Sequence, residues 1–163
     1  VNGNAIYDKE RAKAEAAPTR LSDILHDTPN TLPISDKAWA GCKRKKENSV
    51  KNGKGFGYQK YDQGAKFVST IVASYCKKGE SCLIDQSEKG LNPRTLSPEE
   101  AGRLQGYNII SDGWTPGKGN TDAPFKIVVS KTQAYKQFGN SVAVPVVKRI
   151  AEEIVKQLLN ISI

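Results

Sequence analysis

The segment from residue 146 to the end of the chain carries the pattern that most constrains the fold. Apolar side chains recur there every three or four residues, at Val147, Ile150, Ala151, Ile154, Val155, Leu158 and Leu159. This spacing places them along one face of a helix, and such a face normally lies against a hydrophobic surface. The sequence therefore predicts a long amphipathic C-terminal helix.

The residues just before this helix predict how it begins. Asn140 and Ser141 are of the types that cap helix N-termini, and Pro145 suits a first turn, where a backbone N–H is not needed. With a turn at Gly139, the positive end of the helix would favour a carboxylate or a phosphate. Two interpretations stay open at this point, an ordinary capped helix and an anion-binding helix end.

The charge of the chain favours a polyanionic partner. The net charge is +8 and the sequence pI is near 9.4, and each Lys or Arg that lies near a phosphate releases condensed counterions. Many of the cations crowd one region, where they are interleaved with aromatic side chains: Lys37, Trp39, Lys43, Arg44, Lys45, Lys46, Lys51, Lys54, Phe56, Tyr58, Lys60 and Tyr61. A soluble basic surface without a specific partner is the alternative.

Three glycines alternate with Lys and aromatic residues in the segment 52–58 of this basic region. Glycine lets a backbone approach a ligand closely, Lys binds phosphate, and aromatic rings pack on sugar or base. The Gly-Lys-Ser/Thr of a phosphate-binding loop is missing. The segment is therefore a candidate nucleic-acid contact, with a flexible surface loop as the alternative.

Cysteine and histidine offer no metal site in this sequence. Cys42, Cys76 and Cys82 have no Cys-x-x-Cys spacing, and His26 is the only histidine. Cys76 and Cys82 are expected to be small packing residues, and the odd count fits a reducing cytoplasm. The sequence contains neither a membrane-length apolar run nor a signal-peptide pattern. The absence of Met suggests either that an initiator was removed or that the chain is a piece of a longer protein.

Local patterns predict several short elements. The run 8–17 has high helix propensity with almost no apolar stripe, so it is either a solvated helix or a frayed leader. Residues 19–25 predict a helical turn with apolar side chains facing inward. Branched and aromatic residues at 65–75, followed by 82–84, predict a β-hairpin, and 125–129 predicts one more strand.

A short helix after residue 97 is predicted by its capping signals. Ser97 is an N-cap residue, Pro98 suits the first helical position, and Glu100 can close a capping box with Ser97. The helix should end at Gly106. A long polar loop should follow, from Asn108 to Ala123.

Two of these stretches resemble one family. The segment Arg94–Tyr107, RTLSPEEAGRLQGY, resembles motif IX of the cytosine-5 DNA methyltransferases, and Gln133–Val147, QAYKQFGNSVAVPVV, resembles motif X in nearly every position. Residues 21–75 resemble the target-recognition region that precedes these motifs. Within it, Thr70 and Ile71 fall where the family usually has a Thr-Leu pair near the flipped base.

The resemblance implies a fold and a division of the chain. It implies an α+β arrangement, with a small irregular β-rich recognition part, a short helix, and a long C-terminal helix that packs on an α/β methyltransferase core. The expected parts are a leader at 1–18, helical or disordered, a recognition region at 19–93, and a motif IX and X segment at 94–163.

The resemblance also implies ligands and the residues that bind them. Motif X would complete an S-adenosyl-L-methionine pocket, with Asn140, Ser141 and Val142 directed at the methionine carboxylate. The recognition region would enter the major groove of double-stranded DNA, and its candidate contacts are Lys51, Lys54, Phe56, Tyr58, Thr70 and Ile71. A bacterial restriction–modification enzyme of the cytoplasm, associated with the nucleoid, is the expected setting.

The chemical groups that the family uses for methyl transfer are missing from this sequence. No cysteine follows a proline, Glu47-Asn48 is followed by Ser49 rather than Val, and the Gly-rich cofactor loop is absent. Tyr107-Asn108-Ile109 also replaces the usual Phe-Pro-Asp after motif IX. The chain is therefore expected to be inactive alone and to work with a catalytic N-terminal domain or large subunit. The alternatives are a non-catalytic DNA-binding or regulatory module and a protein–protein interaction module.

Overall fold

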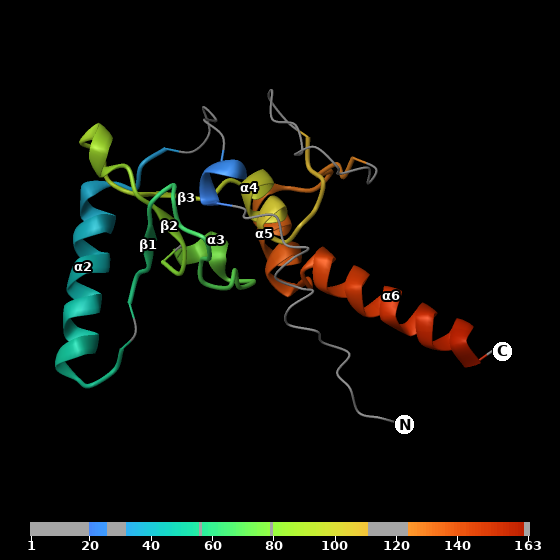
Figure 1. Ribbon diagram of the computed structural model, residues 1–163. Helices are drawn as coiled ribbons and strands as arrows, with labels where there is room; N and C mark the ends of the chain where they lie inside the picture. The colour runs from blue at the N-terminus through green and yellow to red at the C-terminus, as the bar shows by residue number, and fades with distance from the viewer. Residues whose placement is uncertain (1–19, 26–31, 56, 79, 111–123, 162–163) are drawn as a thin grey trace.

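The computed structural model describes residues 20–25, 32–55, 57–78, 80–110 and 124–161. The described elements, in chain order, are η1 (Leu21–Asp23), α2 (Asp36–Lys51), β1 (Lys60–Tyr61), α3 (Tyr75–Lys78), β2 (Leu83–Ile84), η2 (Ser87–Lys89), β3 (Arg94–Thr95), α4 (Pro98–Leu104), α5 (Lys131–Asn140) and α6 (Val144–Ile161). The long helices α2 and α6 extend from opposite sides of a central body (Figure 1). The helix-prone run 8–17 and residues 111–123 of the expected loop lie outside the described residues.

The central body contains a small sheet with the strand order β1-β2-β3. Strands β1 and β2 are parallel, with Lys60 opposite Leu83, whereas β2 and β3 are antiparallel, with Ile84 opposite Arg94. Mixed helix and sheet were expected and are confirmed. The expected β-rich character of residues 19–93 is not confirmed, because the longest element there is the helix α2, which has 16 residues.

The prediction of a β-hairpin from residues 65–75 and 82–84 is wrong. Leu83 and Ile84 do form a strand, but residues 65–74 form none, and the helix α3 begins at Tyr75. Ile71 and Tyr75 are buried because this loop and α3 pack into the core, and not because they alternate across a sheet. The expected strand at 125–129 is wrong as well. That segment forms no strand and bends at Val129, and the Phe125 N–H donates to the Asn108 carbonyl at 2.7 Å.

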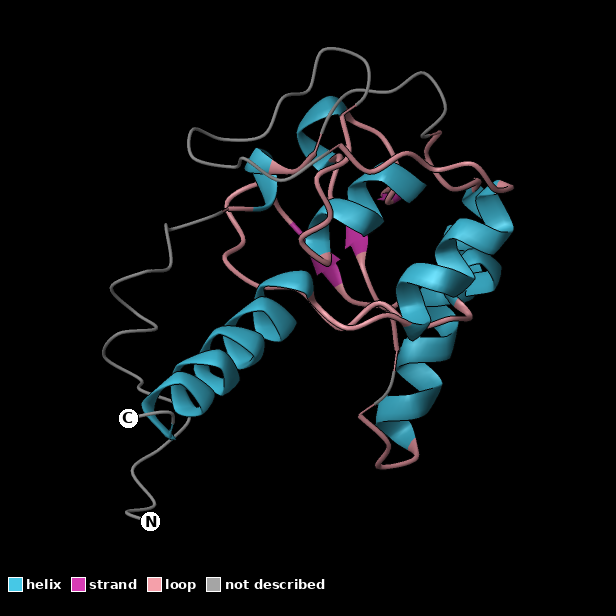
Figure 2. Cartoon of the chain, turned by 90° about the vertical axis from the view of Figure 1, so that its right-hand side faces the viewer, coloured by secondary structure: helices cyan, strands magenta, loops and turns pink. Residues whose placement is uncertain are grey.

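One hydrophobic core of the described residues draws side chains from both 19–93 and 94–163. Its side chains come from η1, α3, β2, α4, α5 and the intervening loops: Leu21, Ile24, Ile71, Tyr75, Cys82, Ile84, Leu96, Ala101, Ile109, Ala134, Tyr135 and Phe138. The predicted inward packing of Leu21 and Ile24 is therefore confirmed, as is the burial of Cys82. The helix α5 contacts both α3 and α4, and helices surround the short strands in Figure 2.

The C-terminal helix is confirmed, but it does not begin as expected. Residues of motif X first form α5, which has Ser130 as its N-cap and contains Gly139 inside its last turn. Asn140 and Ser141 therefore end α5, and the prediction that they cap the terminal helix is wrong. Helix α6 starts at Val144, so Pro145 does lie in a first turn.

Candidate functional site

The motif IX helix α4 is fixed by local capping. The Ser97 hydroxyl accepts from the Glu100 N–H at 3.1 Å, and the Glu100 carboxylate accepts from the Ser97 N–H at 2.8 Å. Pro98 occupies the first turn. This reciprocal arrangement confirms the predicted capping box and satisfies backbone donors that the helix itself leaves unpaired.

Glu100 has a second role that the capping pattern did not reveal. Its side chain is fully buried, and both carboxylate oxygens accept from the Arg94 guanidinium, at 2.8 and 2.9 Å. Arg94 is buried too and also donates to the Thr95 carbonyl. The pair therefore locks β3 to the start of α4 in a position shielded from water.

Two tyrosines hold the backbone at Leu96, between β3 and α4. The Tyr75 hydroxyl accepts from the Leu96 N–H at 2.8 Å and donates to the Cys82 carbonyl, while the Tyr135 hydroxyl donates to the Leu96 carbonyl. Burial raises the pKa of both tyrosines, and it raises the pKa of Cys82 to about 12. All three groups are therefore neutral at physiological pH and serve the structure.

The ends of the two motifs meet at Gly106. Its φ of +83° suits glycine, and a Cβ there would lie 2.4 Å from the Pro145 ring. The Val144 N–H donates to the Gln105 carbonyl at 2.8 Å. The residues that follow α4 thus pack directly on the first turn of α6.

A cavity of about 400 Å³ opens beside this junction. It lies between the loop before α3, the end of α4 and the α5–α6 turn, and its wall consists of Val68, Ser69, Thr70, Ile71, Leu104, Gln105, Gly139, Ser141, Val142 and Ala143. Four residues from the two expected sites are therefore brought together: Thr70 and Ile71 from the recognition region, and Ser141 and Val142 from motif X. Ile71 is a core side chain with only 3% of its surface exposed, whereas Thr70 is exposed.

The backbone donors at this cavity differ from those expected. The Ser141 N–H and hydroxyl both donate to the Phe138 carbonyl, at 3.2 and 2.8 Å. At the start of α6, Val144 is bonded to Gln105, Pro145 has no N–H, and the Val146 N–H donates to the Ala143 carbonyl. The helix end therefore has few donors to offer an anion. Asn140 is exposed and does not line the cavity.

Two backbone donors at the cavity remain available. The N–H groups of Val142 and Ala143 donate to no acceptor within the described part of the chain, and both residues line the cavity. The close approach that shapes this turn depends on Gly139, because a Cβ there would lie 2.3 Å from backbone atoms of Val72 and Ala73. Only glycine allows the two segments to lie this close.

The other candidate DNA contacts lie elsewhere, at the end of α2. Lys51 is in its last turn, Lys54 is exposed just beyond it, and neither lines the cavity. The Tyr58 ring packs on Trp39 with the ring centroids 4.6 Å apart, and Lys46 Nζ lies 4.4 Å from its centroid. Phe56 lies outside the described residues.

Two glycines of this segment, Gly53 and Gly57, are required by the local structure, which the sequence did not predict. Gly53, with a φ of +67°, ends α2, and the Lys54 N–H donates back to the Ser49 carbonyl at 2.8 Å in a Schellman motif. A Cβ on Gly57 would lie 2.8 Å from the Lys46 side chain. Gly55 alone of the three has neither a positive φ nor a neighbour within 4 Å of an added Cβ.

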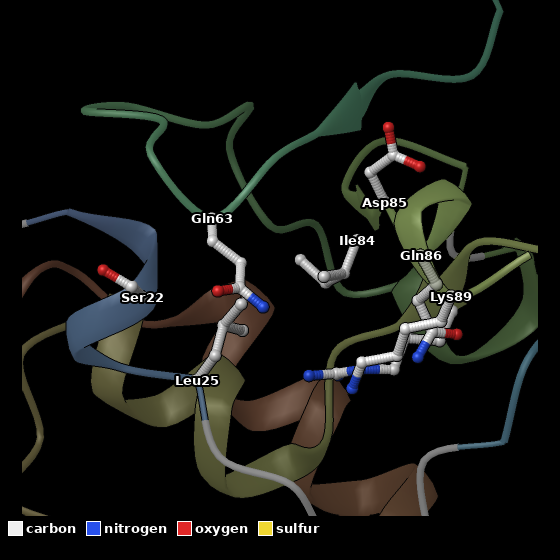
Figure 3. Close-up of a pocket in the computed structure, with 8 residues that line it drawn as sticks. Ser22, Leu25, Gln63, Ile84, Asp85, Gln86 and Lys89 are labelled. Atoms are coloured by element: carbon white, nitrogen blue, oxygen red, sulfur yellow. The ribbon is translucent and has the colours of Figure 1, made fainter. Parts of the chain in front are cut away.

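A second cavity, of about 210 Å³, lies between η1 and the sheet (Figure 3). Gln63 faces it from one side, and Gln86 and Lys89 face it from the other. Asp85 pairs with Lys60 at 2.8 Å. Burial opposes its ionisation, but hydrogen bonds from Lys60 and Ser87 outweigh burial and lower the pKa of Asp85. Because this carboxylate is paired within the protein, we assign the cavity no ligand.

The described residues contain no group of three or more His, Cys, Asp or Glu side chains that could bind a metal. Within the same part of the chain, no helix is long and apolar enough to span a membrane.

Comparison with known proteins identifies the family. The model of the C-5 cytosine-specific DNA methylases matches residues 2–156. The chain belongs to this family. Enzymes of the family take the methyl group that they transfer from S-adenosyl-L-methionine.

Several bacterial enzymes are similar to this member of the family. The type II methyltransferase M.SsoII of Shigella sonnei is 45% identical over 141 residues, which is 86% of this chain and 33% of the relative. M.NlaX of Neisseria lactamica is 41% identical over 145 residues, or 88% of this chain and 41% of the relative. The chain thus spans a third to two fifths of the length of these relatives.

Solved structures of methyltransferases share the fold. S. pombe Dnmt2 superimposes with a TM-score of 0.60 at 16% identity, covering 91% of this chain and 45% of that one. The Entamoeba histolytica methyltransferase EhMeth superimposes with a TM-score of 0.55 at 19% identity, covering 88% of this chain and 42% of that one.

Proposed function

We propose that this chain supplies the DNA-recognition and cofactor-completing portion of a DNA (cytosine-5-)-methyltransferase of the bacterial type II restriction–modification class. The observation that carries the proposal is the shared cavity, where Thr70 of the recognition region lies with Ser141 and Val142 of motif X. A target base and a methyl donor have to meet for the reaction to occur. A cavity walled by both segments provides one side of such a meeting place.

The residues of the cavity fit part of an S-adenosyl-L-methionine site. The free N–H groups of Val142 and Ala143 suit a carboxylate, and the Leu104 side chain offers an apolar wall. When bound, the cofactor supplies the methyl group. Ser141 then acts indirectly, because its two bonds to Phe138 hold the turn that presents the Val142 N–H.

The catalytic groups belong to another part of the enzyme in this proposal. The sequence contains neither a Pro-Cys nor a Glu-Asn-Val motif, so the chain alone is expected to be inactive. We propose 19–93 as the recognition part and 94–163 as the cofactor part, preceded by a leader at 1–18. The division is one of roles, since the described residues of the two parts share one core. The bacterial cytoplasm, close to the nucleoid, is the proposed location.

The test is reconstitution of methyl transfer. The chain is mixed with a companion polypeptide that carries the Pro-Cys and Glu-Asn-Val motifs, and transfer from labelled cofactor to double-stranded DNA is measured. We expect activity that neither polypeptide shows alone. Activity no greater than that of the companion would refute the proposal.

A matched pair of variants tests the cofactor contact in the same assay. Val142→Pro removes the backbone N–H, and the preceding Ser141 already has the extended conformation that proline requires, with φ −81° and ψ 170°. Val142→Ala keeps the N–H. We expect the proline variant to raise the KM for the cofactor at least tenfold and the alanine variant to change it little. Equal values in the two variants would exclude this N–H as a contact.

The alternative function is a DNA-binding module without a catalytic partner. The basic helix α2 is the observation that favours it, since its six cations outnumber its two acids. This alternative predicts DNA binding by the chain that S-adenosyl-L-methionine does not change, and no recovery of methyl transfer with a companion.

A further inference from the structure

Helix α2 has one side that packs and one that does not. Its partly buried residues include Trp39, Cys42, Lys46 and Ser49, which recur at three- and four-residue intervals and therefore lie along one face. This face meets the returning chain, because Trp39 and Lys46 both contact the ring of Tyr58. The opposite face of α2 lies away from these contacts.

Three of the six cations of α2 have partners inside the protein. Lys43 Nζ lies 5.6 Å from the centroid of the Trp39 ring. Lys45 forms an ion pair with Glu80, and Lys46 lies over the Tyr58 ring and donates to its carbonyl. Lys45 and Lys46 therefore help to attach α2 to the body, whereas Lys43 packs on a ring of its own helix.

The other three cations form a line on the outer face. Lys37, Arg44 and Lys51 are exposed and spaced seven residues apart, so they point in nearly the same direction at intervals of about 10 Å along the helix. None of their side chains has a hydrogen bond or an ion pair with another described residue. The two acids of α2 leave this line unpaired. Asp36 accepts from the Asn92 side chain, and Glu47 pairs with neither Arg44 nor Lys51.

The chemistry of this outer line fits a regular polyanion. Gly41 and Asn48 lie between the three cations, so no large apolar side chain lies along the line to favour a membrane or a partner helix. Duplex DNA carries about one negative charge per 1.7 Å of its axis. A helix about 21 Å long between Lys37 and Lys51 can therefore contact phosphates of one duplex with all three cations.

We propose that Lys37, Arg44 and Lys51 form a phosphate-binding line that holds α2 against the backbone of duplex DNA. The inference rests on the proposed function and adds to it a sequence-independent docking surface. Helix α2 leads directly into residues 52–55, the described start of the Gly-rich segment (Figure 1). Phosphate contacts along the helix would therefore position that segment, since such contacts fix register without reading sequence.

The test compares two triple variants of the full chain. Lys37→Gln, Arg44→Gln and Lys51→Gln remove the outer line, whereas Lys43→Gln, Lys45→Gln and Lys46→Gln remove the same charge from cations that have internal partners. Binding to a fluorescent duplex is measured by anisotropy from 50 to 200 mM KCl, after circular dichroism shows that both variants keep their helices. In the outer-line variant, the magnitude of the negative slope of log K against log salt should fall by about 2 to 3. The control should lose less than 1.

The outcomes separate this inference from the proposed function. Equal losses of slope in the two variants, together with intact methyl transfer in the reconstitution assay, would overturn the phosphate-binding line alone. A large loss in the outer-line variant without any recovered methyl transfer would support the line and count against the enzyme. Tighter binding of the parent chain to duplex RNA than to duplex DNA would also refute the proposal that these cations bind the backbone of duplex DNA.

Discussion

Glu100 shows how much one residue of motif IX accomplishes. It closes the capping box of α4, and it also neutralises the buried Arg94. The sequence predicted the first role because the cap residue Ser97 lies only three positions away. The second depends on the strand β3, which brings Arg94 back against the start of the helix.

We predict that Glu100→Ala strongly destabilises the chain. The substitution leaves the Arg94 guanidinium buried without its carboxylate and removes the acceptor of the Ser97 N–H. Loss of one partner of a buried ion pair costs about 3 to 5 kcal/mol. The free energy of unfolding, measured by urea titration, should fall by about that amount.

Glu99→Ala is the matched control for this substitution. Glu99 is in the same first turn, but it is only partly buried and does not pair with Arg94. Its loss should cost at most about 1 kcal/mol, through the helix dipole. Similar destabilisation by the two alanines would mean that the buried pair is not what stabilises this turn.

At the scale of the element, two glycines inside helices show different effects. One position is limited by close packing, and the other only by the low helix propensity of glycine. Gly139 in α5 touches the backbone at Val72 and Ala73, whereas an added Cβ on Gly41 in α2 would meet nothing within 4 Å. Glycine in a helix is less favourable than alanine by about 1 kcal/mol. The two positions should therefore respond to alanine with opposite signs.

We predict that Gly139→Ala destabilises the chain by about 1 to 3 kcal/mol and that Gly41→Ala stabilises it by about 0.5 to 1 kcal/mol. At Gly139 the contact is with backbone, which cannot rotate away as a side chain could. Thermal unfolding monitored by circular dichroism gives both values. Stabilisation by Gly139→Ala would show that the contact with residues 72–73 is not close in solution.

The elements that the sequence predicted are those whose signals are local. The signals of α4 lie within four residues, from Ser97 to Glu100, and α6 has a regular apolar repeat. The hairpin was mispredicted because Tyr75 is buried where it bonds to Leu96, which is distant in sequence. Branched residues that are buried in this way imitate a strand.

Helix α2 was missed for the opposite reason. Its exposed face is charged, it contains Gly41, and its packed face consists mostly of small or polar side chains. No apolar repeat therefore marked it as a helix. The site was predictable only through the family resemblance, since no local pattern shows that Thr70 and Ser141 line one cavity. The donors at Val142 and Ala143 depend on where α5 ends, which no pattern specified.

At the scale of the whole molecule, α6 is an amphipathic helix whose apolar face no other described element covers. It extends from the body in both views (Figures 1 and 2), and no other described helix or strand packs against it. Ile150 is 47% exposed and Ile154 is 54% exposed. On the polar side, Glu153 pairs with Arg149 and Lys156, so the charged face is satisfied within the helix. The proposed catalytic part would bury the apolar face.

We predict that polar substitutions on this face impair reconstitution of the enzyme and leave DNA binding by the chain unchanged. Replacing both Ile150 and Ile154 by Asn should remove about 3 kcal/mol or more of binding free energy that comes from burying apolar surface. This corresponds to at least about a hundredfold weaker association with the companion. The concentration of chain that gives half-maximal methyl transfer measures the effect. Binding to labelled duplex DNA without the companion should stay within twofold of the parent.

The control replaces Glu152 and Lys156 by Asn on the same helix. It introduces the same two side chains and leaves the net charge unchanged, so both variants carry a similar cost in helix propensity. Half-maximal methyl transfer in this control should need little more chain than the parent. If the two variants require the same excess of chain, the apolar face of α6 does not dock on the companion, and the helix contributes only through its stability.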